Sequence, residues 1–306
     1  MHSPLQDIHL NFNAGSLTLL NLCLAFIMFG IALSLKVENF REVAQNLKST
    51  ITGITSQFVL LPLLTFLLVW FANPLPGLAA GMILVAACPG GNISNFFTML
   101  SKGNLALSIS LSAISTILST FMTPMNFGFW SGLLPFTDQF LAAINLDLGE
   151  MIKIVFLIMG FPLLVGIAVA KWLPKFAKII SQPIKILSVI ILFGFIIIAF
   201  YNNFDLFLQY FDYVIYLVLI HNALALSGGY LFGKLMKLPE NDIKTISIET
   251  GIQNSGLGLV IIFNFFEGNG GMAIITAWWG IWHIVSGFAI SQFYSYKNAR
   301  LAREHA

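Results

Sequence analysis

The stretch Glu249-Thr250-Gly251-Ile252-Gln253-Asn254-Ser255-Gly256 places a carboxylate and two amides in the middle of an apolar segment that runs over residues 243–266. A charge inside a membrane span is costly, and such acidic residues usually face a cavity, a proton path or a bound cation. The two glycines that flank the amides allow the helix to unwind and to present its carbonyl oxygens. The stretch therefore predicts an interrupted membrane helix that holds an ion.

The composition of the whole chain is that of a membrane protein. Of its 306 residues, 58% are hydrophobic and 9% are charged, and the mean hydropathy is +0.87. Apolar runs of about 20 residues, long enough to cross the ~30 Å hydrocarbon core of a bilayer, recur along the sequence. We predict an all-α polytopic protein that forms one membrane domain over residues 1–306, in contact with lipid and with no nucleic-acid partner. Cys23 and Cys88 lie within apolar runs and are predicted to be core residues rather than a disulfide or a metal pair.

Nine membrane helices are predicted from the apolar runs and the breaks between them. They cover residues 17–35, 47–72, 77–101, 104–127, 150–171, 183–200, 211–236, 241–266 and 271–296. If the N-terminus lies outside, fourteen of the fifteen Lys and Arg residues fall on the inner side, as the positive-inside rule requires. The exception, Lys153, lies at the outer end of the fifth helix and can reach the headgroups by snorkelling. The predicted topology is N-out and C-in.

One long connector, residues 129–148, separates the fourth helix from the fifth. Its apolar residues recur at helical spacing: Leu133, Leu134, Phe136, Phe140, Leu141 and Ile144. This pattern predicts an interfacial helix on the outer surface, although a plain linker with the same apolar content is equally consistent with it.

A second interruption is predicted in the third helix, at Cys88-Pro89-Gly90-Gly91-Asn92-Ile93-Ser94-Asn95. Pro89 removes a backbone donor and the two glycines relax the helix, so the chain should unwind and restart with Asn92 or Ser94 as the cap. A simple kink is the alternative for this helix taken alone. However, the third and eighth helices cross the membrane in opposite senses, which is the pattern of inverted-topology repeats in transporters.

The repeats can be assigned to helices by their order. Helices one to four, residues 17–127, form the first repeat, and the second repeat lies within residues 150–296. Pairing helices one to four with helices six to nine leaves the fifth helix without a partner. The predicted arrangement is 4+5, in which the first repeat lacks its leading helix.

Three motifs in this order resemble the bile acid:sodium symporter family: residues 88–95, Lys102-Gly103-Asn104-Leu105-Ala106-Leu107-Ser108, and Ile248-Glu249-Thr250-Gly251-Ile252-Gln253-Asn254. The resemblance extends over residues 17–295. It implies a core domain that holds both broken helices, formed by residues 47–127 and 211–296, and a panel domain formed by residues 17–35, 150–171 and 183–200. The nine-helix count is similar to that of the animal bile-acid transporters, whereas the compact loops are typical of bacterial members and predict a bacterial inner membrane.

The family also implies two Na⁺ sites behind the helix crossing and a substrate site beside it. The first Na⁺ site would use Ser94, Asn95, Ser108, Ser112 and Glu249. The second would use Gln57, Glu249, Gln253 and backbone carbonyls near Thr250 and Ile252. The substrate residues would be Asn92, Ile93, Asn254 and His283. Some members have Thr in place of Asn92, and Ile284 stands where bacterial bile-acid binders have a polar amide, so the substrate stays open between a bile acid and a small carboxylate such as pantoate or a keto acid.

The chemistry of these residues is consistent with Na⁺. A hard cation prefers carboxylate, amide, hydroxyl and carbonyl oxygens. Ser108 and Ser112 are four residues apart, so both hydroxyls lie on one helical face. One carboxylate with two monovalent cations leaves about one positive charge, which favours an anionic substrate near freed helix N-termini.

Each of these residues also has a structural interpretation. Membrane serines often bond their own backbone. The structural interpretation of Gln57 is repair of the kink before Pro62, and His221 is expected to be a buried histidine bonded across helices. Proton coupling through Glu249 is the alternative to Na⁺, but the amide-rich shell favours Na⁺. Because the predicted spans contain no paired carboxylates, Ser/Lys dyad or histidine-rich metal motif, an intramembrane enzyme or sensor is disfavoured. We predict a Na⁺-coupled symporter of an organic anion that uses alternating access, with Na⁺ as its coupling ion and no cofactor.

Overall fold

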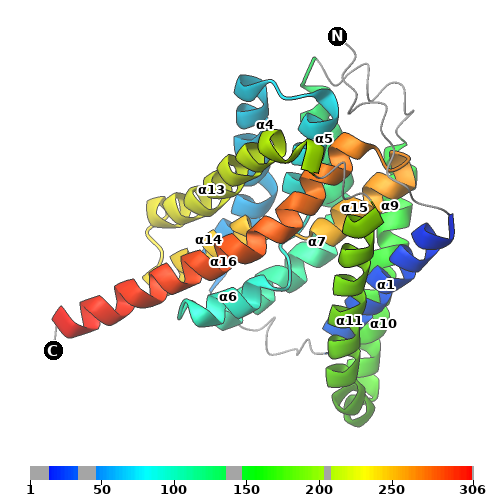
Figure 1. Ribbon diagram of the computed structural model, residues 1–306. Helices are drawn as coiled ribbons and strands as arrows, with labels where there is room; N and C mark the ends of the chain where they lie inside the picture. The colour runs from blue at the N-terminus through cyan, green and yellow to red at the C-terminus, as the bar shows by residue number, and fades with distance from the viewer. Residues whose placement is uncertain (1–13, 34–45, 136–146, 203–207, 305–306) are drawn as a thin grey trace.

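The computed structural model of the chain describes residues 14–33, 46–135, 147–202 and 208–304, and in these ranges every regular element is a helix (Figure 1). Two pairs of α segments are joined through one π turn each, so the described part contains eleven continuous helices. They are α1 (Ala14–Ala32), α3–η2–α4 (Leu47–Thr55, Ser56–Leu60, Leu61–Ala72), α5 (Pro76–Ala87), α6 (Ser94–Leu100), α7 (Leu105–Gly132), α9–η3–α10 (Leu148–Val155, Phe156–Gly160, Phe161–Trp172), α11 (Pro174–Asn202), α13 (Phe211–Leu235), α14 (Glu240–Gly251), α15 (Ser255–Phe265) and α16 (Gly270–Glu304).

The prediction of an all-α polytopic membrane protein is confirmed. Five of the described helices are long and apolar enough to cross a bilayer. They are Leu47–Ala72, Leu105–Gly132, Leu148–Trp172, Val214–Leu235 and Gly270–Tyr296. Three shorter apolar helices, Leu17–Ala32, Pro76–Ala87 and Ser255–Phe265, complete the set.

Several predicted helix ends were placed too early or too late. The helix predicted over 104–127 continues to Gly132, although it contains Pro124. The helix predicted to begin at 183 begins at Pro174, with Pro183 inside it, and the last helix continues to Glu304. Pro124 and Pro183 both lie inside helices, which membrane helices tolerate because neighbouring groups satisfy the carbonyl that the proline leaves free. The predicted interfacial helix within 129–148 lies mainly outside the described residues, since α7 ends at Gly132 and the description resumes at Asp147.

Both π turns precede a proline, and this explains where they form. η2 ends one residue before Leu61-Pro62, and η3 ends one residue before Phe161-Pro162. A π turn widens the helix where the proline ring would otherwise clash with a carbonyl, and such turns often lie at functional sites. η2 holds Ser56 and Gln57, so the wider turn carries residues that contact the broken helices.

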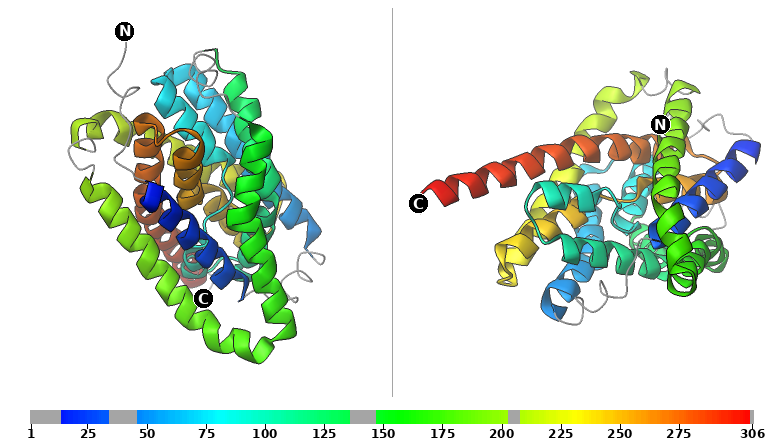
Figure 2. Two further views of the ribbon diagram at one scale, coloured as in Figure 1. Left: turned by 90° about the vertical axis from the view of Figure 1, so that its right-hand side faces the viewer. Right: turned by 90° about the horizontal axis from the view of Figure 1, so that it is seen from below.

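The helices gather into two groups (Figures 1 and 2). In one group, α1 packs against α10 and α11. In the other, α13 packs against α14, and α5 packs against α16. α5 lies at the centre of this second group, because every residue from Gly77 to Ala87 is buried. Gly81 permits the close approach of α5 to α16: a Cβ there would lie 2.3 Å from Ile275 Cγ2 and 2.8 Å from Met272 Cα.

A buried carboxylate joins three helix starts at the end of the molecule where α14 begins. Asp242 in the first turn of α14 is 3% exposed. Its Oδ1 accepts a hydrogen bond from Asn104 Nδ2 (2.8 Å), and its Oδ2 accepts bonds from Asn46 Nδ2 (2.9 Å) and Ser49 Oγ (2.6 Å). The carboxylate therefore fixes the starts of α3, α7 and α14 relative to one another.

Asp242→Ala should lower the stability of the protein, because it leaves one buried donor (Ser49) and two half-buried donors (Asn46 and Asn104) without their charged acceptor. We expect a loss of about 3 kcal/mol, which corresponds to a melting temperature lower by about 6 °C for a chain of this size. The measurement is thermal unfolding of the purified protein in detergent. Asp212→Ala is the control, since Asp212 is an exposed carboxylate in the first turn of α13. An equal shift in the two variants would contradict the role given to Asp242.

Candidate ion and substrate site

The two interrupted helices cross at their breaks, as predicted. α5 ends at Ala87 and α6 begins at Ser94, while α14 ends at Gly251 and α15 begins at Ser255. The backbones pair in an antiparallel bridge between Gly90 and Gln253. Gly91 N donates to Ile252 O (2.7 Å), and Asn254 N donates to Pro89 O (2.8 Å). Two unwound segments far apart in sequence thus satisfy some of each other's backbone hydrogen-bond donors and acceptors.

The predicted capping of α6 is wrong. The N-cap of α6 is Ile93, and no side chain caps this helix. Its first amides bond the carbonyls of residues 91–93 instead, for example Ser94 N to Gly91 O at 2.9 Å. The Ser94 hydroxyl, which was expected to be available as a cap, is directed to Glu249.

Glu249 lies in a cage of serine hydroxyls. The residue is 4% exposed. Its Oε1 accepts hydrogen bonds from Ser94 Oγ (2.5 Å), Ser108 Oγ (2.5 Å) and Ser112 Oγ (3.2 Å), and Ser112 Oγ also lies 3.2 Å from Oε2. The carboxylate also lies against the first break, since a Cβ on Gly90 would be 2.8 Å from Oε2. Within the described ranges no Lys, Arg or His forms an ion pair with Glu249, and no group of three His, Cys, Asp or Glu is found.

Asn95 is the remaining residue predicted for the first Na⁺ site, and the structure places it near the site only through its position in the chain after Ser94. It follows Ser94 in α6 and forms no hydrogen bond to Glu249. Its Oδ1 is shielded from solvent and has no hydrogen-bond partner among the described residues. Because buried polar atoms are nearly always paired, an unpartnered carbonyl oxygen one residue after Ser94 suits a bound cation.

Gln57 and Gln253, both predicted for the second site, form a reciprocal amide pair. Gln57 Nε2 donates to Gln253 Oε1 (2.8 Å) and to Cys88 O (2.8 Å), and Gln253 Nε2 donates to Gln57 Oε1 (3.3 Å) and to Thr250 O (2.8 Å). The alternative role for Gln57, repair of its own helix before Pro62, is wrong because these bonds go to the two broken helices. The pair connects α3–α4 to both breaks.

The carbonyls freed at the end of α14 already have partners. Thr250 O accepts from Gln253 Nε2, Ile252 O accepts from Gly91 N, and Gly251 O accepts from Asn222 Nδ2 at 2.7 Å. Each carbonyl oxygen keeps a second lone pair. The glutamines and the Thr250 carbonyl expected at the second site therefore lie together, and the two amides are bonded to one another.

The predicted substrate residues border the crossing, but no hydrogen bond joins any two of them. Asn92 and Ile93 are half-buried in the first break. Asn254 is half-buried, and its Oδ1 caps α15 by accepting from Leu257 N (3.1 Å). His283 is 7% exposed, and its Nδ1 has no hydrogen-bond partner in the described part of the chain.

The position of His283 along α16 places it near the crossing. A Cβ on Gly280 would meet Ser255 Oγ at 2.6 Å, and a Cβ on Gly287 would meet Phe97 Cδ2 at 2.6 Å and Ile252 Cδ1 at 3.0 Å. His283 follows Gly280 by three residues and precedes Gly287 by four, so it lies on the same face of α16 as both glycines. That face is the one that packs against the residues of the two breaks.

Sequence reasoning missed three residues that support the breaks. Asn222 holds the Gly251 carbonyl, Thr123 Oγ1 donates to Ala87 O (2.8 Å) at the end of α5, and Ser56 Oγ lies 2.7 Å from Thr250 Oγ1. A polar residue in the middle of a span was the signal available for each. His221, in contrast, is bonded across helices as expected, because its Nε2 lies 2.7 Å from Thr65 Oγ1 and its ring packs 4.5 Å from Trp279.

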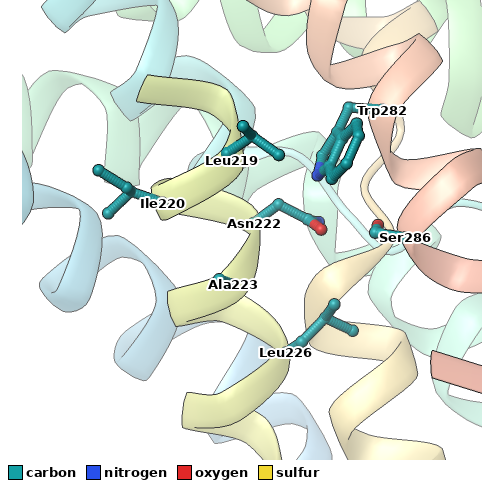
Figure 3. A pocket seen from close by; sticks show the side chains of 7 residues that line it. All are labelled: Leu219, Ile220, Asn222, Ala223, Leu226, Trp282 and Ser286. Atoms are coloured by element: carbon teal, nitrogen blue, oxygen red, sulfur yellow. The ribbon is translucent and has the colours of Figure 1, made fainter. Parts of the chain in front are cut away.

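Asn222 also lines the groove shown in Figure 3, which has a volume of about 400 Å³ and opens between α13 and α16. The side chain of Asn222 extends from α13 toward Trp282 and Ser286 of α16 (Figure 3). The remaining lining residues are Leu219, Ile220, Ala223 and Leu226. No residue predicted for an ion or a substrate lines this groove, so the groove and the Glu249 cage are different places.

Asn222→Leu should weaken cation binding without touching any predicted ligand. Asn222 is 1% exposed, and leucine at this position leaves the Gly251 carbonyl without its donor. The break then loses one of its anchors, and we expect the affinity for Na⁺ to fall about ten-fold, in line with the loss of one well-formed bond inside a protein. The measurement is a Na⁺ titration of tryptophan fluorescence. Ser227→Ala is the control, because Ser227 bonds only carbonyls of its own helix, α13; equal effects would exclude the anchoring role.

Comparison with known proteins assigns the chain to a family. Residues 21–210 match the profile of the Sodium Bile acid symporter family. The chain belongs to this family. The resemblance inferred from the motifs at the two breaks is thereby confirmed. Since the family is one of sodium-dependent membrane transporters, the chain is a sodium-dependent transporter and not an enzyme.

Relatives of this symporter family occur in bacteria, plants and animals. The chain is 30% identical over 274 residues to the uncharacterized sodium-dependent transporter YocS of Bacillus subtilis, and the aligned region covers 90% of this chain and 82% of that protein. It is 31% identical to the probable chloroplastic sodium/metabolite cotransporter BASS1 of Arabidopsis thaliana, over 88% of this chain and 64% of that protein. It is 30% identical to the sodium/bile acid cotransporter 5 of Rattus norvegicus, over 84% of this chain and 58% of that protein. The chain thus spans less than two thirds of the plant and rat proteins.

Proposed function

We propose that the protein is a symporter that couples the entry of a small organic anion, such as a bile acid or a small carboxylate, to Na⁺ by alternating access. The observation that carries the proposal is the environment of Glu249. This carboxylate lies where the two broken helices cross, is buried, and has three serine hydroxyls as hydrogen-bond partners. A buried carboxylate without a cationic side chain favours a bound cation as its counter-charge.

The first Na⁺ site is assigned to Ser94, Asn95, Ser108, Ser112 and Glu249. The serine hydroxyls now donate to Glu249, but each can rotate its hydrogen away and turn a lone pair to a cation. The carboxylate oxygens and the unpartnered Asn95 Oδ1 supply further oxygen ligands. A set of oxygens without sulfur or imidazole suits a hard ion such as Na⁺.

The second Na⁺ site is assigned to Gln57, Glu249, Gln253 and the carbonyls of Thr250 and Ile252. Na⁺ would accept one lone pair from each glutamine oxygen, and the second lone pair of each oxygen can still accept the hydrogen bond from the other amide. Binding therefore links α3–α4 to α14 and to the first break, which supports a role for this site in coupling.

The charge balance of the site supports an anionic substrate. Two Na⁺ ions and one carboxylate carry a net charge of about +1, and the described neighbours of Glu249 add no charge. Asn92, Ile93, Asn254 and His283 are assigned to the substrate, since they border the crossing and leave the His283 Nδ1 without a partner. The plant and rat relatives are named for a metabolite and for bile acid respectively.

The architecture supports nine membrane spans, N-out and C-in, with inverted repeats in a 4+5 arrangement. In each repeat a broken helix, α5–α6 or α14–α15, follows an unbroken span and precedes a long one, α7 or α16. The two breaks pair in antiparallel fashion, as inverted repeats require. We assign α1, α9–α10 and α11 to a panel that moves against a core made of the other helices, in a bacterial inner membrane.

The proposal is tested by uptake into proteoliposomes across a panel of labelled organic anions, which includes taurocholate, pantoate and pyruvate. An inward Na⁺ gradient should drive accumulation of at least one anion, whereas an equal K⁺ gradient should not. Accumulation driven by a proton gradient without Na⁺ would establish the proton-coupled alternative, and absence of any gradient-driven uptake would refute symport.

A further inference from the structure

An amide pair crosses the interface between α1 and α15. The face of α1 that packs into the core is apolar and includes Leu20, Leu24 and Met28, which are 4%, 4% and 1% exposed. Asn21 lies on α1 next to Leu20 and is half-buried. Asn264 lies in the last turn of α15 and is also half-buried. Figure 2 (left) shows the N-terminal end of α1 beside this part of the chain.

The two side chains satisfy each other. Asn21 Nδ2 donates to Asn264 Oδ1 (3.2 Å), and Asn264 Nδ2 donates to Asn21 Oδ1 (3.0 Å). Asn264 Nδ2 also donates to Val260 O on its own helix (2.7 Å), which fixes the orientation of its amide. A reciprocal pair of this kind is fully bonded in one relative position of the two helices only.

The position of the pair gives it a directional effect. Asn21 lies in the N-terminal half of α1, and Asn264 lies just before the loop at Glu267, whereas α14 begins after Lys234 and Lys237 at the opposite end of the broken helix. The pair therefore lies at the lysine-poor end of the molecule, which is the outer end in the proposed topology. Separation of α1 from α15 would break both bonds of the pair in a largely apolar interface and leave Asn264 with only its bond to Val260 O.

We propose that Asn21 and Asn264 form a latch that closes the outer side of the transporter, bonded when the outer side is shut and released when it opens. The inference rests on the proposed function, since it assigns the two asparagines to opposite sides of the panel–core boundary in an alternating-access cycle. The latch makes no contact with the ion cage. It therefore affects the ratio of the outer-open to the outer-closed population of the transporter rather than the affinity for Na⁺.

The test measures this ratio by the distance between two spin labels at the outer side. Cys is placed at Phe71, 81% exposed at the end of α4, and at Leu148, 38% exposed at the start of α9, with Cys23 and Cys88 replaced by Ala. Asn21→Leu and Asn264→Leu should each shift the population toward the longer, outer-open distance by roughly ten-fold, as the loss of two interhelical bonds predicts. The double variant should shift it no further, because either change removes both bonds.

Matched variants separate the latch from simple packing. Asn126→Leu removes a half-buried amide whose Oδ1 accepts from Trp130 on the same helix, and it should leave the distances unchanged. Asn21→Ala removes the amide without adding bulk and should show the same shift as Asn21→Leu. It also tests the latch if the leucine variant folds poorly. Unchanged distances in the Asn21 and Asn264 variants, or additive shifts in the double variant, would overturn the latch.

The proposed function is judged separately, by the uptake of the unsubstituted protein. If Na⁺-driven uptake is present and the distances do not respond to the Asn21 variants, the latch is wrong and the symporter stands. If the distances respond but no gradient drives uptake, the interface moves as proposed and the assigned transport is wrong.

Discussion

Glu249→Gln should abolish Na⁺-driven uptake and weaken Na⁺ binding at least a hundred-fold. Glu249 is the only carboxylate among the residues assigned to both Na⁺ sites, so its loss removes the negative charge from both. At an effective dielectric constant of about 20, a charge pair at contact distance contributes about 4 kcal/mol, more than the loss expected here. Glutamine also turns an amide donor toward hydroxyls that now donate to the carboxylate.

The measurement is tryptophan fluorescence of the purified protein during titration with NaCl against KCl, followed by uptake in proteoliposomes. Glu240→Gln is the matched control, because Glu240 lies exposed in the first turn of the same helix, α14. That variant should keep its Na⁺ response. A normal Na⁺ response of Glu249→Gln would show that the cation binds elsewhere. Proton-driven uptake by the unsubstituted protein in the absence of Na⁺ would show that Glu249 titrates during transport.

Much of this site can be predicted from the sequence, because the helix breaks and the serine spacing depend on local sequence patterns. Pro89 and the adjacent glycines mark the first break, and Gly251 marks the second, since each residue changes the backbone at its own position. Ser108 and Ser112 share a face through helical spacing alone. These signals do not depend on how the helices pack, and the structure brings both serines to Glu249.

The rest of the site depends on the register between helices, which no local pattern reports. Asn222 reaches the Gly251 carbonyl because α13 lies against α14, and the Asn21–Asn264 pair forms because α1 lies against α15. The cap of α6 was predicted wrongly for the same reason. Ser94 has the residue type of a cap, but a partner 155 residues away takes its hydroxyl.

Gly91 is a position where the register between the two breaks has little tolerance. A Cβ on Gly91 would lie 2.9 Å from the Gln253 carbonyl oxygen and 3.2 Å from its carbon, and both are backbone atoms. Its own amide donates to Ile252 O at 2.7 Å, so the residue cannot withdraw without breaking the bridge between the two helices. A flexible side chain could yield at such a contact, whereas two unwound backbones that hold each other cannot.

Gly91→Ala should therefore separate the breaks, destabilise the protein by about 2 kcal/mol and lower the melting temperature by about 4 °C. Because the Gly90–Gln253 bridge holds the amide pair beside Glu249, Na⁺-driven uptake should fall by more than about ten-fold, the factor that corresponds to 1.4 kcal/mol. Gly132→Ala is the matched control, since a Cβ there meets nothing within 4 Å, and it should leave both quantities nearly unchanged. Normal uptake by Gly91→Ala would show that the two breaks need not touch during transport.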